Sequence, residues 1–278
     1  MSSPLFTAAL PHYTPAAGKA VPYDWFTTLM DNTSAVANGY GTQTDVSTTG
    51  TTNNLAPAAA AWHQVWTGAS TWTITGQVPV QNGQIQVYSN QSASSVLKFT
   101  HEDAGSTAAN RFTLPSTQGQ QIGPKGSIGF RYDGTNSRWR VLFIEPGAPI
   151  AFTPTITSSG GGTPTYTTQV GTFVQRGSVA HVQGRITLAT KGTLAAGTAG
   201  IGLPFTSTPT TSNFGHMTIG YFSGITTAIV MLAAYIQPST AGSTFCFTTG
   251  AAAGTTTCNV TDISGTFDVI FSADYALT

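Results

Sequence analysis

The sequence predicts an all-β protein in which an N-terminal segment is followed by two antiparallel β-sandwich domains. Short runs that alternate apolar and polar residues recur along the chain, and clusters of Gly, Pro, Asn and Ser separate them. No stretch of the second half keeps a helical period. A chain of 278 residues is also long enough for about two domains, each with its own core.

The first segment, residues 1–45, carries apolar residues spaced by prolines. PYDWFTTLMDN predicts one short helix, because Pro22 suits a first turn and Asp24 favours the positive N-terminal end. So small an apolar segment cannot bury itself, so it should dock on its own domain or on a partner. The residues expected to make that contact are Tyr13, Tyr23, Trp25, Phe26 and Leu29.

The first domain, residues 46–147, is predicted from runs such as TWTITGQVPV, GQIQVYSN and SVLKFTHE, which alternate apolar and polar positions. Asn82–Gln84 gives a tight-turn signal between two of these strands. SIGFRY and RWRVLFI flank the turn DGTNS and predict a β-hairpin with its arginines on the solvent face. Asp133 should bond local backbone amides and lie near those arginines.

The second domain, residues 150–278, follows a stretch rich in Pro and Gly at 145–165. Because this part shows strand patterns and no helical period, we predict an antiparallel sandwich of about eight strands. The predicted strands are TYTTQVGTFVQRG, SVAHVQGRITLAT, MTIGYFSG, TAIVMLAAYI, STFCFTTG and GTFDVIFSADYAL.

The charge pattern argues against several partners. Only 7% of the residues are Asp, Glu, Lys or Arg, and ten bases cancel ten acids. Such a surface gives little steering toward phosphate, so neither nucleic acid nor an anionic membrane is an expected partner. The apolar stretch at 225–236 is 12 residues long, too short to span a membrane, and predicts a buried strand or hairpin. The N-terminus lacks the pattern of a signal peptide, which predicts synthesis and folding in a cytoplasm.

Catalytic chemistry is not predicted, and the protein is expected not to be an enzyme. Hydrolysis of sugars needs two carboxyl groups roughly 5 to 9.5 Å apart, and the ten acids are few and scattered. Glu102 and Asp103 are adjacent and are expected to cap a turn. The sequence contains no nucleophile elbow, no phosphate loop and no metal-binding spacing of its five histidines, so no cofactor and no metal are expected.

Two features leave alternatives open. Cys246 and Cys258 could oxidise across a hairpin, although reduced buried thiols are expected in a cytoplasm. Trp62, Trp66 and Trp72 could stack on sugar rings, although core packing is the commoner fate beside strand-like runs.

Residues 97–142 resemble a module found repeatedly in bacteriophage fibre, spike and other virion proteins. That module contains a "GQ…V.N" strand, an "H…NRF" turn, a "G.S" edge and a "YDGT.SRWRV" hairpin in this order. The matching positions, with the strand included, are Gly83, Gln84, Asn90, His101, Asn110, Arg111, Phe112, Gly126, Ser127 and Tyr132 through Val141. The match covers about residues 50–145.

The second half is similar to the C-terminal sandwich of many phage fibre and spike proteins. The matching positions are Phe152 to Thr155, Tyr166, Gly171, Phe173, Arg176, Gly177, Val179, Val182, Gly184, Ile186 and Leu203 to Phe205, with Phe173 in place of the usual Tyr. The resemblance implies a jelly-roll-like head that trimerises around a threefold axis.

Together these resemblances imply a non-enzymatic virion protein, either a homotrimeric short fibre or spike or a decoration of the capsid. Residues 1–45 would attach it to a capsid, neck or tail protein, and the distal head could contact a glycan of the host surface. The alternative is a carbohydrate-binding module, with loops around Ser207–Phe214 and Ser239–Phe245 holding the sugar.

Overall fold

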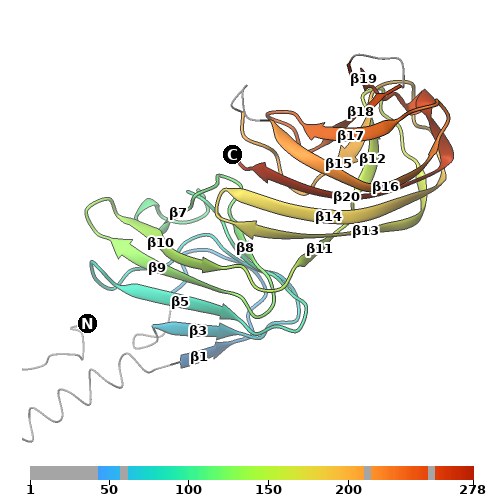
Figure 1. The fold of residues 1–278 in the computed structure, drawn as a ribbon. Coiled ribbons are helices and arrows are strands. Elements are labelled where there is room, and N and C mark those ends of the chain that lie inside the picture. The colour runs from blue at the N-terminus through green and yellow to red at the C-terminus, as the bar shows by residue number, and fades with distance from the viewer. Residues whose placement is uncertain (1–42, 57–61, 210–213, 250–253) are drawn as a thin grey trace, which may run out of the picture.

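The computed structural model describes residues 43–56, 62–209, 214–249 and 254–278. Strands and two short 3-10 turns make up the regular structure of these residues, which confirms the all-β prediction (Figure 1). Two hydrophobic clusters form, one built from residues up to Ile144 and the other chiefly from Ile150 onward. We call the parts around them the N-terminal module, residues 43–145, and the C-terminal module, residues 150–278. The predicted short helix and the five docking residues of the first segment lie outside the described residues.

The N-terminal module begins as a β-solenoid, in which successive coils place one strand in each of two sheets. One sheet contains β1 (Gln43–Val46), β3 (His63–Trp66) and β5 (Ile85–Asn90), and the other contains β2 (Gly50–Thr52), β4 (Trp72–Ile74) and β6 (Leu97–Phe99). Within each sheet these strands pair in parallel. The prediction of an antiparallel sandwich is therefore wrong for this part of the chain.

The error has a physical cause. Alternation of apolar and polar residues predicts a strand with one buried face, and it carries no information on the direction of the neighbouring strand. The predicted turn at Asn82–Gln84 is present, with Gly83 at a φ of 78°. It does not close a hairpin, because β4 and β5 on its two sides belong to different sheets.

Antiparallel pairing closes the N-terminal module. β8 (Gln120–Ile122) pairs with β6, β9 (Ser127–Asp133) pairs with β5 and β10 (Arg138–Glu145), and β7 (Phe112–Thr113) pairs in parallel with β10. The predicted hairpin is confirmed: Tyr132 and Trp139 are buried, while Arg131 and Arg140 are exposed. Asp133 accepts bonds from the backbone of Thr135 and Asn136 and from Arg140 Nε at 2.8 Å, as predicted.

The core of the N-terminal module is aromatic. Trp66, Trp72, Tyr88, Phe99, Phe112, Phe130 and Trp139 are each fully buried. The Phe112 and Phe130 ring centroids lie 4.6 Å apart, and Trp66 and Trp72 lie 6.4 Å apart. Core packing is therefore the role of Trp66 and Trp72, and neither is available to stack on a sugar.

The C-terminal module is antiparallel, as predicted. Its eight-stranded sheet has the order β11-β13-β14-β20-β16-β17-β18-β19, and β12 and β15 form a separate pair. The bounds are β11 (Ile150–Phe152), β12 (Thr155–Ser158), β13 (Thr165–Arg176), β14 (Val179–Thr190), β15 (Ala199–Gly202), β16 (Gly215–Ile225), β17 (Met231–Ile236), β18 (Ser243–Thr248), β19 (Thr256–Thr257) and β20 (Ile263–Ala276). One core cluster contains Phe173 of β13 and Phe247 of β18, near opposite edges of the sheet, so the sheet curls around its own core. The expected sandwich of two separate sheets is replaced by this curled sheet.

Buried glutamines join the two modules. Gln120 of β8 and Gln175 of β13 are both fully buried and exchange side-chain bonds with each other's strands. Next to them, Gln118 bonds the backbone N–H of Thr206 at 2.8 Å and the carbonyl of Thr206 at 2.5 Å. Side chains of each module therefore make hydrogen bonds to backbone groups of the other module.

Candidate functional site

The residues that carry the phage resemblance have structural roles in the N-terminal module. The amide of Asn90 donates to the carbonyls of Ser95 and Ile122, both at 2.9 Å. His101 Nδ1 lies 3.0 Å from the backbone N–H of Leu114. Arg111 Nε donates to the carbonyl of Ser106 at 2.9 Å. These polar groups fix the turns between strands.

The same holds in the C-terminal module. Tyr166 Oη accepts a bond from the backbone N–H of Ile156 at 3.0 Å. Gly177 adopts a φ of 59°, and its N–H donates to Gln120 Oε1 at 3.0 Å. The resemblance is thus carried by residues that build the fold.

The predicted turn acids are confirmed as structural. Glu102 accepts bonds from Arg138 Nε at 2.8 Å and from Thr113 Oγ1 at 2.7 Å, and Asp103 accepts one from the N–H of Gly105. Burial opposes ionisation of Glu102, but the bond from Arg138 and its charge leave the pKa of Glu102 below its ordinary value. Both carboxylates thus accept hydrogen bonds that hold the turn.

The outer face of the large sheet offers an accessible surface with a hollow. We define this outer face by the residues of β13, β14, β20 and β16 that alternate with buried core residues. Strand register places Val170, Arg185, Ile270 and Tyr221 in one row and Thr172, Gln183, Ser272 and Thr218 in the next. Val170 is 58% exposed, which is unusual for a valine in a strand.

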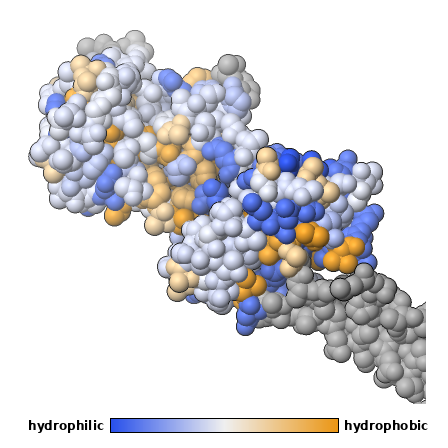
Figure 2. Space-filling view, turned by 180° about the vertical axis from the view of Figure 1, so that it is seen from behind, coloured by the Kyte–Doolittle hydropathy of each residue, from blue (hydrophilic) through white to orange (hydrophobic). Residues whose placement is uncertain are grey.

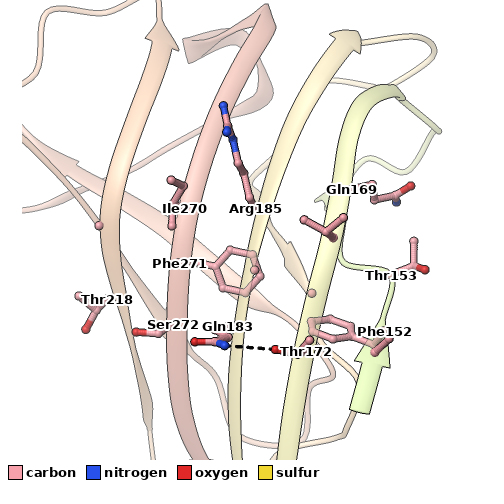
Figure 3. Close-up of a pocket in the computed structure, with 15 residues that line it drawn as sticks. Phe152, Thr153, Gln169, Thr172, Gln183, Arg185, Thr218, Ile270, Phe271 and Ser272 are labelled. Atoms are coloured by element: carbon pink, nitrogen blue, oxygen red, sulfur yellow. Dashed lines mark hydrogen bonds between the residues drawn. The ribbon is translucent and has the colours of Figure 1, made fainter. Parts of the chain in front are cut away.

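A shallow hollow of about 850 Å³ lies against these two rows. Figure 3 places Arg185, Gln183, Thr172, Ser272 and Thr218 around it, with Gln183 Nε2 bonded to Thr172 Oγ1 at 3.3 Å. The backbones of Gly171, Gly184 and Gly220 also line it. On the side shown in Figure 2, apolar side chains gather in a patch on the C-terminal module beside the junction.

The charges beside the hollow neutralise each other. Arg185 Nη2 lies 2.7 Å from Asp268 Oδ2, and Thr187 Oγ1 donates to the same carboxylate at 3.0 Å. The bond from Arg185 is the main reason why the pKa of Asp268 is lowered. A guanidinium with this partner is a weak anchor for an anionic ligand, and the paired carboxylate is a poor proton donor at neutral pH.

A third row of the outer face combines aromatic, imidazole and carboxylate groups. His181, Asp274, His216 and Tyr235 are successive partners across β14, β20, β16 and β17. His181 Nδ1 lies 2.8 Å from Asp274 Oδ1. Phe214, two residues before His216, packs against Tyr235 with ring centroids 5.9 Å apart. We call these five residues the aromatic row.

The predicted sugar-holding loops are close to this row. Ser207 Oγ donates to the carbonyl of Gln237, and the backbone N–H of Thr240 donates to Ser207 Oγ at 3.2 Å. The two predicted loops therefore contact each other. Contacts of the neighbouring Thr206 with Gln118 place these loops of the C-terminal module beside the junction with the N-terminal module. Residues 210–213 of the first loop lie outside the described part.

Sequence reasoning missed the aromatic row. Its members come from strands separated by up to 93 residues, so only the register of the sheet brings them together. The available signal was the placement of His181, His216 and Asp274 at the polar positions of alternating strands.

The cysteines and the potential metal ligands complete the set of predicted site features. Both cysteines are free; burial, with nearby Asp262 and Cys246, raises the pKa of Cys258 to about 12. Among the described residues, no group of three His, Cys, Asp or Glu side chains is arranged to hold a metal ion. No helix in the described part of the chain is long and apolar enough to cross a membrane.

Comparisons with known proteins find similarity to solved structures but none to a family model or a curated protein. The fold is similar to the crystal structure of the Dettilon tailspike protein (gp208), with a TM-score of 0.42 and 11% sequence identity. The similarity covers 85% of this chain and 45% of that chain, so the chain spans less than half of that tailspike.

Proposed function

We propose that this protein is a non-enzymatic structural component of a bacteriophage virion, a homotrimeric short fibre or spike or a decoration of the capsid. One observation carries the proposal. The motif residues that resemble phage fibre modules hold turns and strands together, and buried amides join the two modules. A structural component of a particle must keep its modules in a fixed arrangement, and hydrogen bonds between the modules serve this purpose.

The surface chemistry supports the same function. Arg138, Arg140 and Arg185 are each paired with a carboxylate, at 2.7 to 2.8 Å. A neutral β surface that is rich in turns suits a protein that works outside a cell, and a chain that packs against copies of itself needs fewer solubilising charges.

Homotrimer formation is part of the proposal. Val170, Ile270 and Tyr221 are 58%, 41% and 49% exposed on the outer face. They share one row at the hollow with Arg185, which lies between Val170 and Ile270. Contact between copies would remove this apolar area from water.

Attachment to the particle is proposed to use residues 1–45, with Tyr13, Tyr23, Trp25, Phe26 and Leu29 as the contacts to a capsid, neck or tail protein. The test is deletion of residues 1–30 in a phage genome that encodes the protein. The deleted chain should fold and keep the mass of the full-length oligomer, yet be missing from purified particles by immunoblot. Incorporation of the deleted chain at the normal level would contradict the attachment role.

A carbohydrate-binding module is the second candidate function. It is favoured by one specific observation, the exposed aromatic row beside the two loops that were expected to hold sugar.

A further inference from the structure

We propose that the aromatic row, Phe214, Tyr235, His216, Asp274 and His181, binds a neutral hexose unit of a surface glycan. The proposal rests on the second candidate function, carbohydrate binding, and names its site and its ligand class. It does not depend on whether the protein is part of a virion.

Strand register places the members of the row on one face. Residues directly opposite each other in an antiparallel pair point to the same side of the sheet. His181 faces Asp274, Asp274 faces His216, and His216 faces Tyr235. The intervening Met217 and Ala273 are buried, so the row itself points away from the core.

Phe214 and Tyr235 form an aromatic pair at the surface, and the exposed ring of Phe214 is not part of the hydrophobic core. Phe214 is 59% exposed, and its ring is tilted by 58° to that of Tyr235. By contrast, Phe173, Phe205 and Phe245, which also contact aromatic rings in this module, are buried, and Phe152 is partly buried. An exposed ring can cover the apolar C–H face of a hexose, and burial of that face from water favours binding.

Hydrogen-bonding groups stand next to this platform. Asp274 Oδ1 contacts His181 Nδ1 at 2.8 Å, which orients the carboxylate, and Oδ2 makes no hydrogen bond to another described residue. The carboxylate is half-exposed, with 47% of its side-chain surface accessible. A carboxylate oxygen accepts bonds from sugar hydroxyls, and the imidazole of His216 in the adjacent strand can accept or donate one.

The charge of the row selects a neutral ligand. Where His181 is neutral, its 2.8 Å contact leaves the negative charge of Asp274 in place, and this charge repels the carboxylate of an acidic sugar and the phosphate of a teichoic acid type polymer. Arg185, the cation two rows away, is already paired with Asp268 at 2.7 Å. Neutral glycans built from glucose, galactose or mannose present C–H faces and vicinal hydroxyls without this repulsion.

The test is binding of the full-length protein to an array of neutral and sialylated or phosphorylated glycans, followed by calorimetry on the strongest neutral glycan. The wild type should bind at least one neutral hexose glycan, and acidic glycans should bind more weakly. Phe214→Ala and Asp274→Asn should each weaken that binding by about tenfold or more, in line with the loss of one stacking contact or one charge-assisted hydrogen bond. Val230→Ala, which removes apolar surface from a loop residue that is 70% exposed, should leave it unchanged.

Folding and assembly are checked in the same samples. Each variant must keep the thermal midpoint and the solution mass of the wild type, and Tyr235→Ala replaces Phe214→Ala if the latter does not fold. Absence of binding to every neutral glycan would overturn the proposal. A drop in oligomer mass for Phe214→Ala would overturn it as well, because the ring would then be a contact between copies.

Discussion

Gln120 and Gln175 each use a side-chain amide to bond the backbone of the strand that carries the other. Gln120 Nε2 donates to the carbonyl of Gln175 at 3.1 Å, and Gln175 Oε1 accepts from the N–H of Gln121 at 3.0 Å. Gln175 Nε2 also donates to the carbonyl of Gly119 at 2.7 Å. Both side chains are fully buried. If one of these bonds is lost, the remaining polar group has no hydrogen-bond partner and no water to replace it.

Substitution Gln175→Ala should therefore destabilise the protein, by about 2 to 4 kcal/mol, because buried backbone groups on both modules lose their partners. Urea unfolding measures this change. Gln183→Ala is the matched control on the adjacent strand, where the exposed glutamine makes one long bond to Thr172 at 3.3 Å. Equal urea midpoints for the two variants would show that the glutamine contacts do not hold the modules together.

Gly184 should not tolerate a side chain. A Cβ added there would lie 2.8 Å from the carbonyl oxygen of Val170 and 2.8 Å from the Phe271 ring. Gly184→Ala should cost about 1 to 3 kcal/mol in free energy of unfolding, because backbone and a packed ring have to move.

Gly220 lines the same hollow and serves as the control, since the nearest atom to its added Cβ is the Ile270 oxygen at 3.9 Å. Gly220→Ala should leave the thermal midpoint unchanged or raise it slightly, because alanine restricts the unfolded chain. If both variants melt at the same temperature, close packing at Gly184 is not a constraint.

Stability should fall in acid. Bonds from Asn136, then from Arg140, lower the pKa of Asp133 from 3.8 to about 2. A carboxyl whose pKa is lower in the folded protein stabilises the fold above its unfolded pKa and loses this contribution as the pH falls through the folded pKa. The contribution of Asp133 should thus disappear between about pH 4 and pH 2.

Urea midpoints measured across that interval test the assignment. The wild type should lose stability more steeply between about pH 4 and pH 2 than Asp133→Asn, which has no charge to lose. Parallel pH profiles for the two proteins would argue that the hairpin carboxylate contributes nothing to folding.

The thiols should react slowly in the folded protein. Burial raises the pKa of both cysteines, that of Cys258 to about 12, and the thiolate is the reactive form. Alkylation near about pH 8, followed by mass spectrometry, should label Cys258 far more slowly in buffer than in guanidinium chloride. Fast labelling of Cys258 under native conditions would mean that the segment around Cys258, between β19 and the following 3-10 turn, opens readily.

Much of the C-terminal module could be predicted from the sequence, because long alternating runs such as the one around Phe267 to Tyr275 define strands locally. The hairpin around Asp133 was predictable for the same reason, since its turn chemistry and both strands are contiguous. The parallel coils were not, because β1, β3 and β5 meet partners about twenty residues away whose direction no local pattern encodes. The aromatic row was missed for a related reason, since it depends on the register of four strands.

The solution mass of the purified full-length protein, measured by light scattering, tests the central claim most directly. A homotrimer of 28.8 kDa chains has a mass of 3 × 28.8 kDa, which is 86.4 kDa, and the proposed virion component predicts this value. A mass of 28.8 kDa would contradict the trimeric fibre and leave a single-chain decoration or sugar-binding module as the function that fits the fold.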